Sequence, residues 1–185
     1  MQIAILGWGS LYWNLGALAT DGNWQSDGPW LPIEFARLSS QHRLTLVLFA
    51  NAGLIRTYWI KSARTELNAA CENLGQRESC KQADIGFLTQ NGASHIHPLP
   101  GLEQRIREWL VGKPHLEAVI WTDLRSNFRK RRNREFSTQD ALDYLQELIV
   151  QGEHAAAEQY IRRAPPQTDT CLRRRARELL GWTDR

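Results

Sequence analysis

The stretch MQIAILGWGSL, at residues 1–11, is the part of the sequence that says most about the fold, because it predicts a strand followed by a tight turn. Residues 2–6 are mostly apolar and predict a first, buried strand. No basic segment precedes this run, so we expect a strand here and not a signal peptide. Gly7-Trp8-Gly9-Ser10 follows at once and predicts a tight turn at the strand end.

Such a turn offers backbone N–H groups that can bind an anion such as a carboxylate, although a simple turn without a ligand fits the residues as well. A dinucleotide fingerprint needs a third glycine at position 12, which is Tyr12, and a helix that we do not expect there. A nucleophile elbow needs Gly-x-Ser-x-Gly, and Leu11-Tyr12 follow Ser10. We reject both.

The rest of the chain begins with strands and ends with helices, which predicts an α+β fold. Alternating or apolar runs predict strands at 33–38, 44–49, 55–60, 83–88 and 118–122, the first three forming a meander. Helical spacing predicts helices at 67–74, 102–110, 137–148, 155–162 and 170–180. The first of these should end at Gly75. Residues 11–31 form a long connection, a feature typical of functional loops.

Composition excludes several classes of protein. The chain has 185 residues, 42% hydrophobic and 23% charged, which is typical of a globular protein of about one domain. No run of 18 apolar residues indicates a membrane span. Three cysteines, an odd number, favour a reduced, cytoplasmic protein.

The net charge of +3 is modest, but six basic residues gather between Arg125 and Arg134. Acidic residues follow closely and no stacking aromatics interrupt the run, so we expect an exposed, mobile loop and not a nucleic-acid site. His95 and His97 would share one face of a strand, but no third ligand is indicated, so no metal site is predicted. Cys71 lies on an apolar helix face and should pack in the core.

Glu78 is the carboxylate of most interest. It follows Gly75 just beyond the predicted helix, so it can project over one end of a sheet. Held against apolar walls, a carboxylate has a raised pKa and can act as a general base. The alternative is a surface glutamate paired with Arg77.

Two motifs in order resemble one family. Gly7-Trp8-Gly9-Ser10-Leu11 after an N-terminal strand is similar to the Tyr-Gly-Ser-Leu loop of γ-glutamylcyclotransferase-like proteins. Leu74-Gly75-Gln76-Arg77-Glu78 after a helix resembles the Leu-x-x-Arg-Glu segment of the ChaC branch. The resemblance covers residues 1–125.

The resemblance implies a small mixed β-barrel with surrounding helices over residues 1–125. Residues 126–185 have no counterpart in the family, and we expect them to form an Arg-rich loop and a helical extension packed on the barrel. The resemblance also implies an enzyme that cyclises a γ-glutamyl amine or peptide and releases 5-oxoproline. Glu78 would be the general acid/base, and Gly7, Trp8, Gly9, Ser10 and Leu11 would bind the substrate. No cofactor or metal is implied.

Two alternatives stay open. One is a catalytically silent protein of the same fold that binds a small amino-acid derivative. The other is a nucleic-acid-associated protein that uses the Arg125 to Arg134 run, whose binding would weaken steeply with salt.

Overall fold

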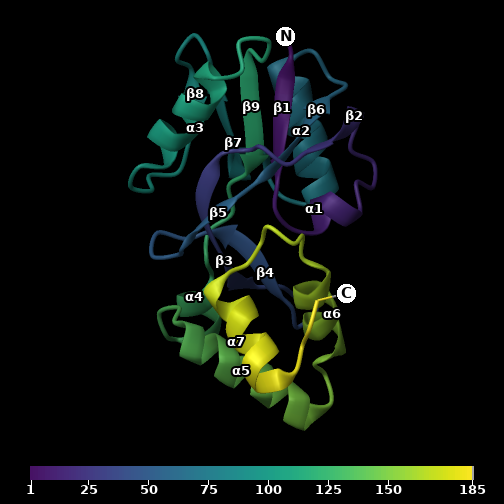
Figure 1. Cartoon of the computed structure of the whole chain (residues 1–185), viewed down its shortest axis with the longest axis vertical. Coiled ribbons are helices and arrows are strands. Elements are labelled where there is room, and N and C mark those ends of the chain that lie inside the picture. The colour runs from purple at the N-terminus through teal and green to yellow at the C-terminus, as the bar shows by residue number, and fades with distance from the viewer. Residues whose placement is uncertain (185) are drawn as a thin grey trace. The chain divides into compact units, whose positions relative to one another are not determined.

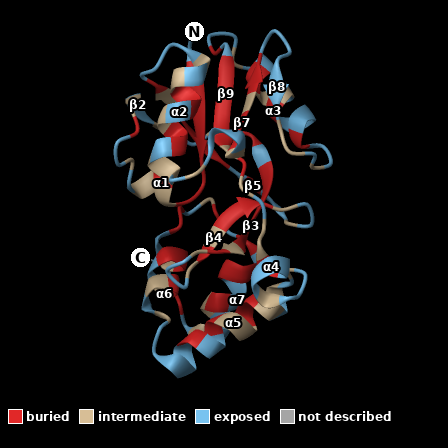
Figure 2. Ribbon diagram, turned by 180° about the vertical axis from the view of Figure 1, so that it is seen from behind, coloured by how far each residue is buried: buried red, intermediate tan, exposed pale blue. Residues whose placement is uncertain are grey.

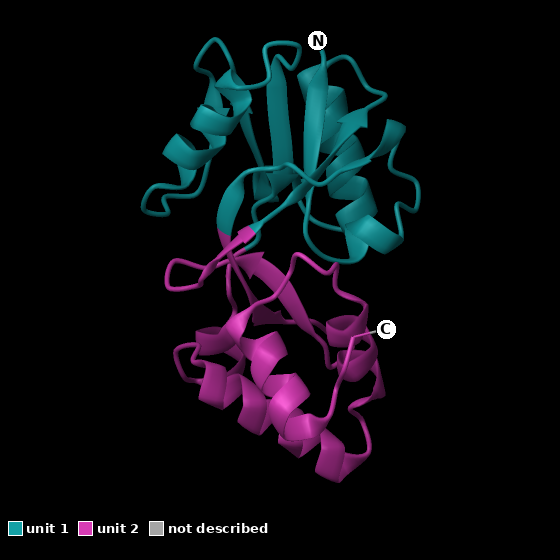
Figure 3. Cartoon of the chain, viewed as in Figure 1, with its two compact units in different colours: residues 1–31, 56–124 teal, residues 32–55, 125–185 magenta. Residues whose placement is uncertain are grey.

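A computed structural model describes residues 1–184 and shows an α+β protein with two compact units (Figure 3). Unit 1 is Met1–Leu31 with Arg56–Leu124, and unit 2 is Pro32–Ile55 with Arg125–Arg185. Within the part of the chain described, no helix is both long and apolar enough to span a bilayer.

Unit 1 contains an open six-stranded sheet, so the closed barrel expected from the resemblance is not found among residues 1–184. The strand order is β2-β6-β1-β9-β7-β8, which leaves β2 and β8 as edges. The strands are β1 (Ile3–Gly7), β2 (Thr20–Gln25), β6 (Tyr58–Ser62), β7 (Ile85–Thr89), β8 (Ser94–His95) and β9 (Ala118–Thr122).

The predicted first strand is confirmed and occupies the centre of this sheet. β1 pairs antiparallel with β6 and parallel with β9. All five β1 residues are buried, because a central strand is covered on both faces (Figure 2). The glycine turn therefore starts from the end of a buried strand that is paired on both sides.

Helices cover the sheet, and among them α2 contributes most to the hydrophobic core of unit 1 (Figure 1). Cys71 and Leu74 on α2 pack with Ile5 and Ile120, which confirms the predicted core position of Cys71. The helices of unit 1 are α1 (Ser10–Trp13), α2 (Leu67–Glu78), α3 (Leu102–Val111) and the 3-10 helix η1 (Gln82–Asp84).

Residues 32–55, which the sequence analysis assigned to the N-terminal domain, contact the C-terminal segment instead. The Asn127 side chain donates to the Leu38 carbonyl and accepts the Leu38 N–H, both at 2.8 Å. The Phe35 ring packs edge-on against Tyr160 at 6.2 Å. An amide that satisfies both backbone groups of one strand residue cannot be recognised from sequence spacing.

Unit 2 contains most residues of a three-stranded sheet, whose strand order is β4-β3-β5. The expected meander is wrong, because a meander would place β4 in the centre, whereas β3 pairs on both sides. The predicted strand at 55–60 splits at Thr57, whose N–H and hydroxyl both donate to the Pro29 carbonyl. The strands are β3 (Trp30–Leu38), β4 (Leu44–Leu48) and β5 (Leu54–Arg56).

The C-terminal helices form as predicted, with Ser137 and Thr170 as N-caps that accept N–H groups of the first turn. The Arg-rich segment differs from the expected mobile loop: it contains the short helix α4, anchored by the buried Phe128. The helices of unit 2 are α4 (Phe128–Arg132), α5 (Thr138–Gln151), α6 (Ala155–Arg163) and α7 (Cys171–Leu180).

Candidate functional site

The glycine turn leads directly into a one-turn helix. Gly7 ends β1, Gly9 is the N-cap residue, and Ser10 begins α1. The expectation that no helix opens there is wrong, but the missing third glycine still excludes a dinucleotide fingerprint. Leu11 is buried in the core.

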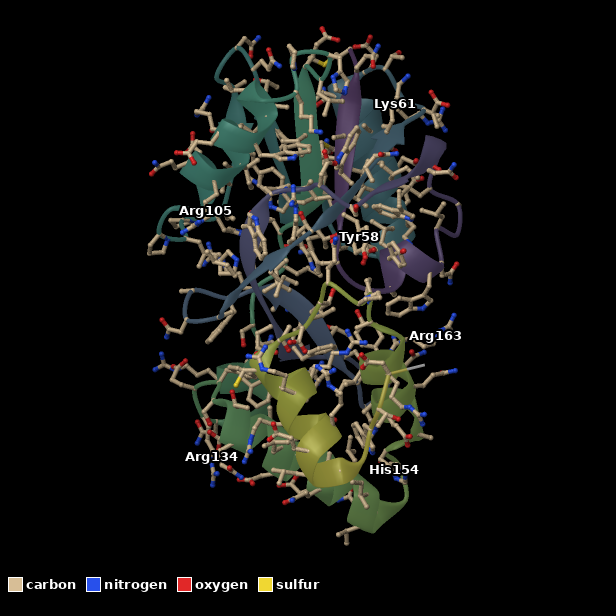
Figure 4. The ribbon with its side chains drawn as sticks, in the orientation of Figure 1. Tyr58, Lys61, Arg105, Arg134, His154 and Arg163 are labelled. Atoms are coloured by element: carbon tan, nitrogen blue, oxygen red, sulfur yellow. The ribbon has the colours of Figure 1, made fainter. Side chains whose placement is uncertain are left out.

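Aromatic rings hold the start of this turn. A Cβ on Gly7 would lie 2.5 Å and 2.8 Å from two ring carbons of Trp24, so only glycine fits here without movement. The Tyr12 ring lies 5.7 Å from Trp24 and 4.4 Å from Tyr58, which is labelled in Figure 4. Trp8 is itself buried, so it supports the turn from within the protein.

The helix α2 ends later than predicted. It continues through Gly75 to Glu78, and Ser79 takes the left-handed conformation (φ 52°) that ends it. Gly75 lies inside the helix, and its carbonyl accepts the Cys80 N–H at 3.0 Å beyond the helix end. A Cβ at Gly75 would lie 3.4 Å from the Cys80 carbonyl oxygen, which is an ordinary contact distance. Glu78 therefore belongs to the last helical turn.

The Glu78 carboxylate is partly buried and paired. Its side chain is 19% exposed, and Arg77 Nη1 donates to Glu78 Oε1 at 2.8 Å. Burial raises the pKa of Glu78 above its usual value, and the charge and hydrogen bond of Arg77 oppose that rise. The alternative interpretation, a surface glutamate paired with Arg77, predicted this ion pair correctly. The carboxylate is nevertheless not on an open surface.

Arg77 also joins Glu78 to the segment that follows the glycine turn. Its Nη2 donates to the Asn14 carbonyl, and the Asn14 N–H donates to the Ser10 carbonyl at 2.9 Å. One guanidinium thus separates the Glu78 carboxylate from the end of α1.

Asn73 lies four residues before Arg77, on the same face of α2. It accepts the Ala19 N–H at 2.8 Å and donates to the Ala17 carbonyl at 3.2 Å. Asn14 and Asn73 were not predicted from the sequence, and Arg77 was predicted only as a pairing partner of Glu78. The four-residue spacing of Asn73 and Arg77 in the sequence indicates that both lie on one face of α2.

A second polar cluster in unit 1 surrounds a buried carboxylate that the sequence analysis did not find. Asp123 accepts the His97 N–H at 2.8 Å, and burial raises the pKa of Asp123. His97 Nδ1 lies 2.7 Å from the Asp123 carbonyl oxygen, and His95 Nε2 lies 3.1 Å from the Ala83 carbonyl oxygen. Among residues 1–184, no group of three ligand-type side chains is placed to hold a metal ion.

Comparison with protein-family models, curated proteins and solved structures finds no match to this chain. A partly buried carboxylate of raised pKa can exchange a proton with an amine. The first N–H groups of a helix have no acceptor within it and can donate to a developing oxyanion.

Proposed function

We propose that the chain is a γ-glutamylcyclotransferase-like enzyme. The observation that carries this proposal is the placement of Glu78: a partly buried carboxylate, joined through Arg77 to the Asn14 end of the segment that begins with the glycine turn. The motif order adds support, because Gly7 to Leu11 and Glu78 come from the two segments that resemble this family. The central β1, the turn and α2 would then correspond to the family's catalytic domain.

In the proposed reaction, Glu78 takes a proton from the α-ammonium group of the substrate. The free amine attacks the γ-carbonyl carbon and forms a five-membered ring. Backbone N–H groups of Gly9, Ser10 and Leu11 donate to the oxyanion that develops. Glu78 then returns its proton to the leaving nitrogen as the C–N bond breaks. The ring nitrogen, which is positively charged after the attack, gives its extra proton to the released amine, so the products are neutral 5-oxoproline lactam and the protonated amine.

The chemistry suits a site with one carboxylate. An α-amine is largely protonated near neutral pH, so a base is required before attack. Ring closure is intramolecular, so holding the γ-glutamyl chain folded supplies much of the acceleration. Neither step calls for a metal or a cofactor.

The basic segment gives weaker support to nucleic-acid binding. Three of its arginines already have acidic partners: Arg129 with Glu135, Arg132 with Glu147, and Arg134 with Asp140. These pairs reduce the charge available to phosphates, and we assign the segment no catalytic role.

The test is a screen of γ-glutamyl amines and peptides for release of 5-oxoproline by the purified protein. Turnover of at least one compound supports the proposal. Saturable binding of such compounds without turnover would instead establish the silent binding protein. Tight binding of DNA or RNA at physiological salt, without turnover, would overturn the proposal in favour of the nucleic-acid function.

A further inference from the structure

The Arg77 side chain contacts two parts of the site at once. It is 11% exposed, and its two terminal nitrogens donate to different acceptors: Nη1 to the Glu78 carboxylate and Nη2 to the Asn14 carbonyl. Its Cγ also lies beside Gly16, 3.8 Å from where a Cβ would stand. The guanidinium is thus enclosed between the last turn of α2 and residues 14–16.

We propose that Arg77 is a positioning residue, which fixes the Glu78 carboxylate relative to the chain that follows the glycine turn. That this positioning serves catalysis rests on the proposed function. Arg77 would touch neither the reacting amine nor the carbonyl, and would act only through Glu78 and Asn14.

Arginine is suited to this role because its guanidinium is planar and presents donors in a fixed fork. A lysine in the same place would keep the charge but would offer a single, rotating ammonium group. The side-chain amide of Asn73, on the same face of α2, bonds the Ala17 carbonyl and the Ala19 N–H. Arg77 completes this attachment at the end closest to the glycine turn, so its loss should loosen residues 14–16 more than residues 17–19.

The charge of Arg77 has a second consequence. Burial raises the pKa of Glu78, and among the described residues Arg77 is the charged group that acts against that rise. A general base must be ionised before it can accept a proton, so Arg77 extends the pH range in which Glu78 can act. Removal of the guanidinium charge should move the acid limb of kcat/KM to higher pH.

The experiment uses the full chain with Arg77→Lys and Arg77→Met. Arg107→Met is the matched control, since Arg107 forms an ion pair with Glu103 on the exposed face of α3. The readouts are the carbon-13 NMR titration of the Glu78 carboxyl, hydrogen exchange of the Gly16 N–H, and kcat/KM against pH.

In Arg77→Met we expect the pKa of Glu78 to rise and Gly16 exchange to become faster. Below the new pKa, each unit of rise should lower kcat/KM about tenfold, because the ionised fraction falls by that factor. In Arg77→Lys the pKa should stay near the wild-type value while exchange still becomes faster. Arg107→Met should change neither.

An unchanged or lower Glu78 pKa in Arg77→Met would overturn the assignment, as would unchanged Gly16 exchange in both variants. If Arg77→Met does not fold, faster exchange in Arg77→Lys supports the assignment and unchanged exchange overturns it. If the wild-type protein releases no 5-oxoproline from any γ-glutamyl compound but the NMR and exchange changes occur, the proposed function is wrong and the positioning by Arg77 stands.

Discussion

Gly7 offers the sharpest test of how the glycine turn is built. A methyl group at this position would lie 2.5 Å and 2.8 Å from two carbons of the Trp24 ring. Carbon atoms in ordinary contact are about 3.5–4.0 Å apart, so the ring or the strand must move by roughly 1 Å. Tyr12, whose ring lies 5.7 Å from Trp24, limits that movement.

Overpacking of this kind costs about 1–3 kcal/mol. We expect Gly7→Ala to lower the free energy of unfolding by about 2 kcal/mol, since Trp24 lies on the edge strand β2 and can yield in part. Gly53→Ala is the matched control, because no atom lies within 4 Å of a Cβ built there.

A double-mutant cycle with Trp24→Ala isolates the contact. In that background the methyl group has room, so Gly7→Ala should be close to neutral, within about 0.5 kcal/mol. Urea unfolding followed by circular dichroism gives all four free energies. A full cost of Gly7→Ala in the Trp24→Ala background would refute the steric explanation.

Two further predictions concern stability. Ser79→Gly should raise the free energy of unfolding by about 0.5–1 kcal/mol, because Ser79 ends α2 in the left-handed conformation that glycine adopts without strain. Thermal melts measure this change. A melting temperature lower than that of the wild type would contradict it. Glu34 is buried in unit 2, where it accepts the N–H groups of Phe35 and Leu172, and burial raises its pKa above 4.5. The protonated form is therefore favoured in the folded state, so the stability of the wild type relative to Glu34→Gln should fall as pH rises from below 4.5 through the raised pKa. Denaturant titrations between pH 4 and pH 7 test this, and a difference that grows with pH would contradict it.

Periodicity was sufficient where a segment packs on one side only. The helix faces around Leu74 and Ile106 and the cap Ser137 could be predicted, because each depends on neighbours within a few residues. For the last helix the sequence offered Asp169 or Thr170 as the cap, and Thr170 is the cap observed. The end of α2 was predicted wrongly. Gly75 has the residue type of a helix stop, but α2 continues past it and ends only where Ser79 adopts the left-handed conformation.

The sheet order and the unit boundaries could not be predicted, because they depend on contacts distant in sequence. β3 is central in its sheet, and Asn127 holds Leu38 across 89 residues. At the candidate site, the sequence identified the glycine turn and Glu78 as separate motifs. The guanidinium that joins Glu78 to Asn14, in the segment that follows the glycine turn, could be recognised only from the structure.

The central claim is that Glu78 is the base of a cyclisation reaction. The most direct measurement is 5-oxoproline release by Glu78→Gln, with Glu72→Gln on the exposed face of α2 as control and circular dichroism to verify folding. Glutamine keeps the size of the side chain but cannot accept the proton, so the rate should fall by about 10² to 10⁴, whereas Glu72→Gln should leave it unchanged. Ser10→Ala should cost much less, because alanine keeps the backbone N–H. A folded Glu78→Gln variant with wild-type activity, or a larger loss in Ser10→Ala than in Glu78→Gln, would contradict the account.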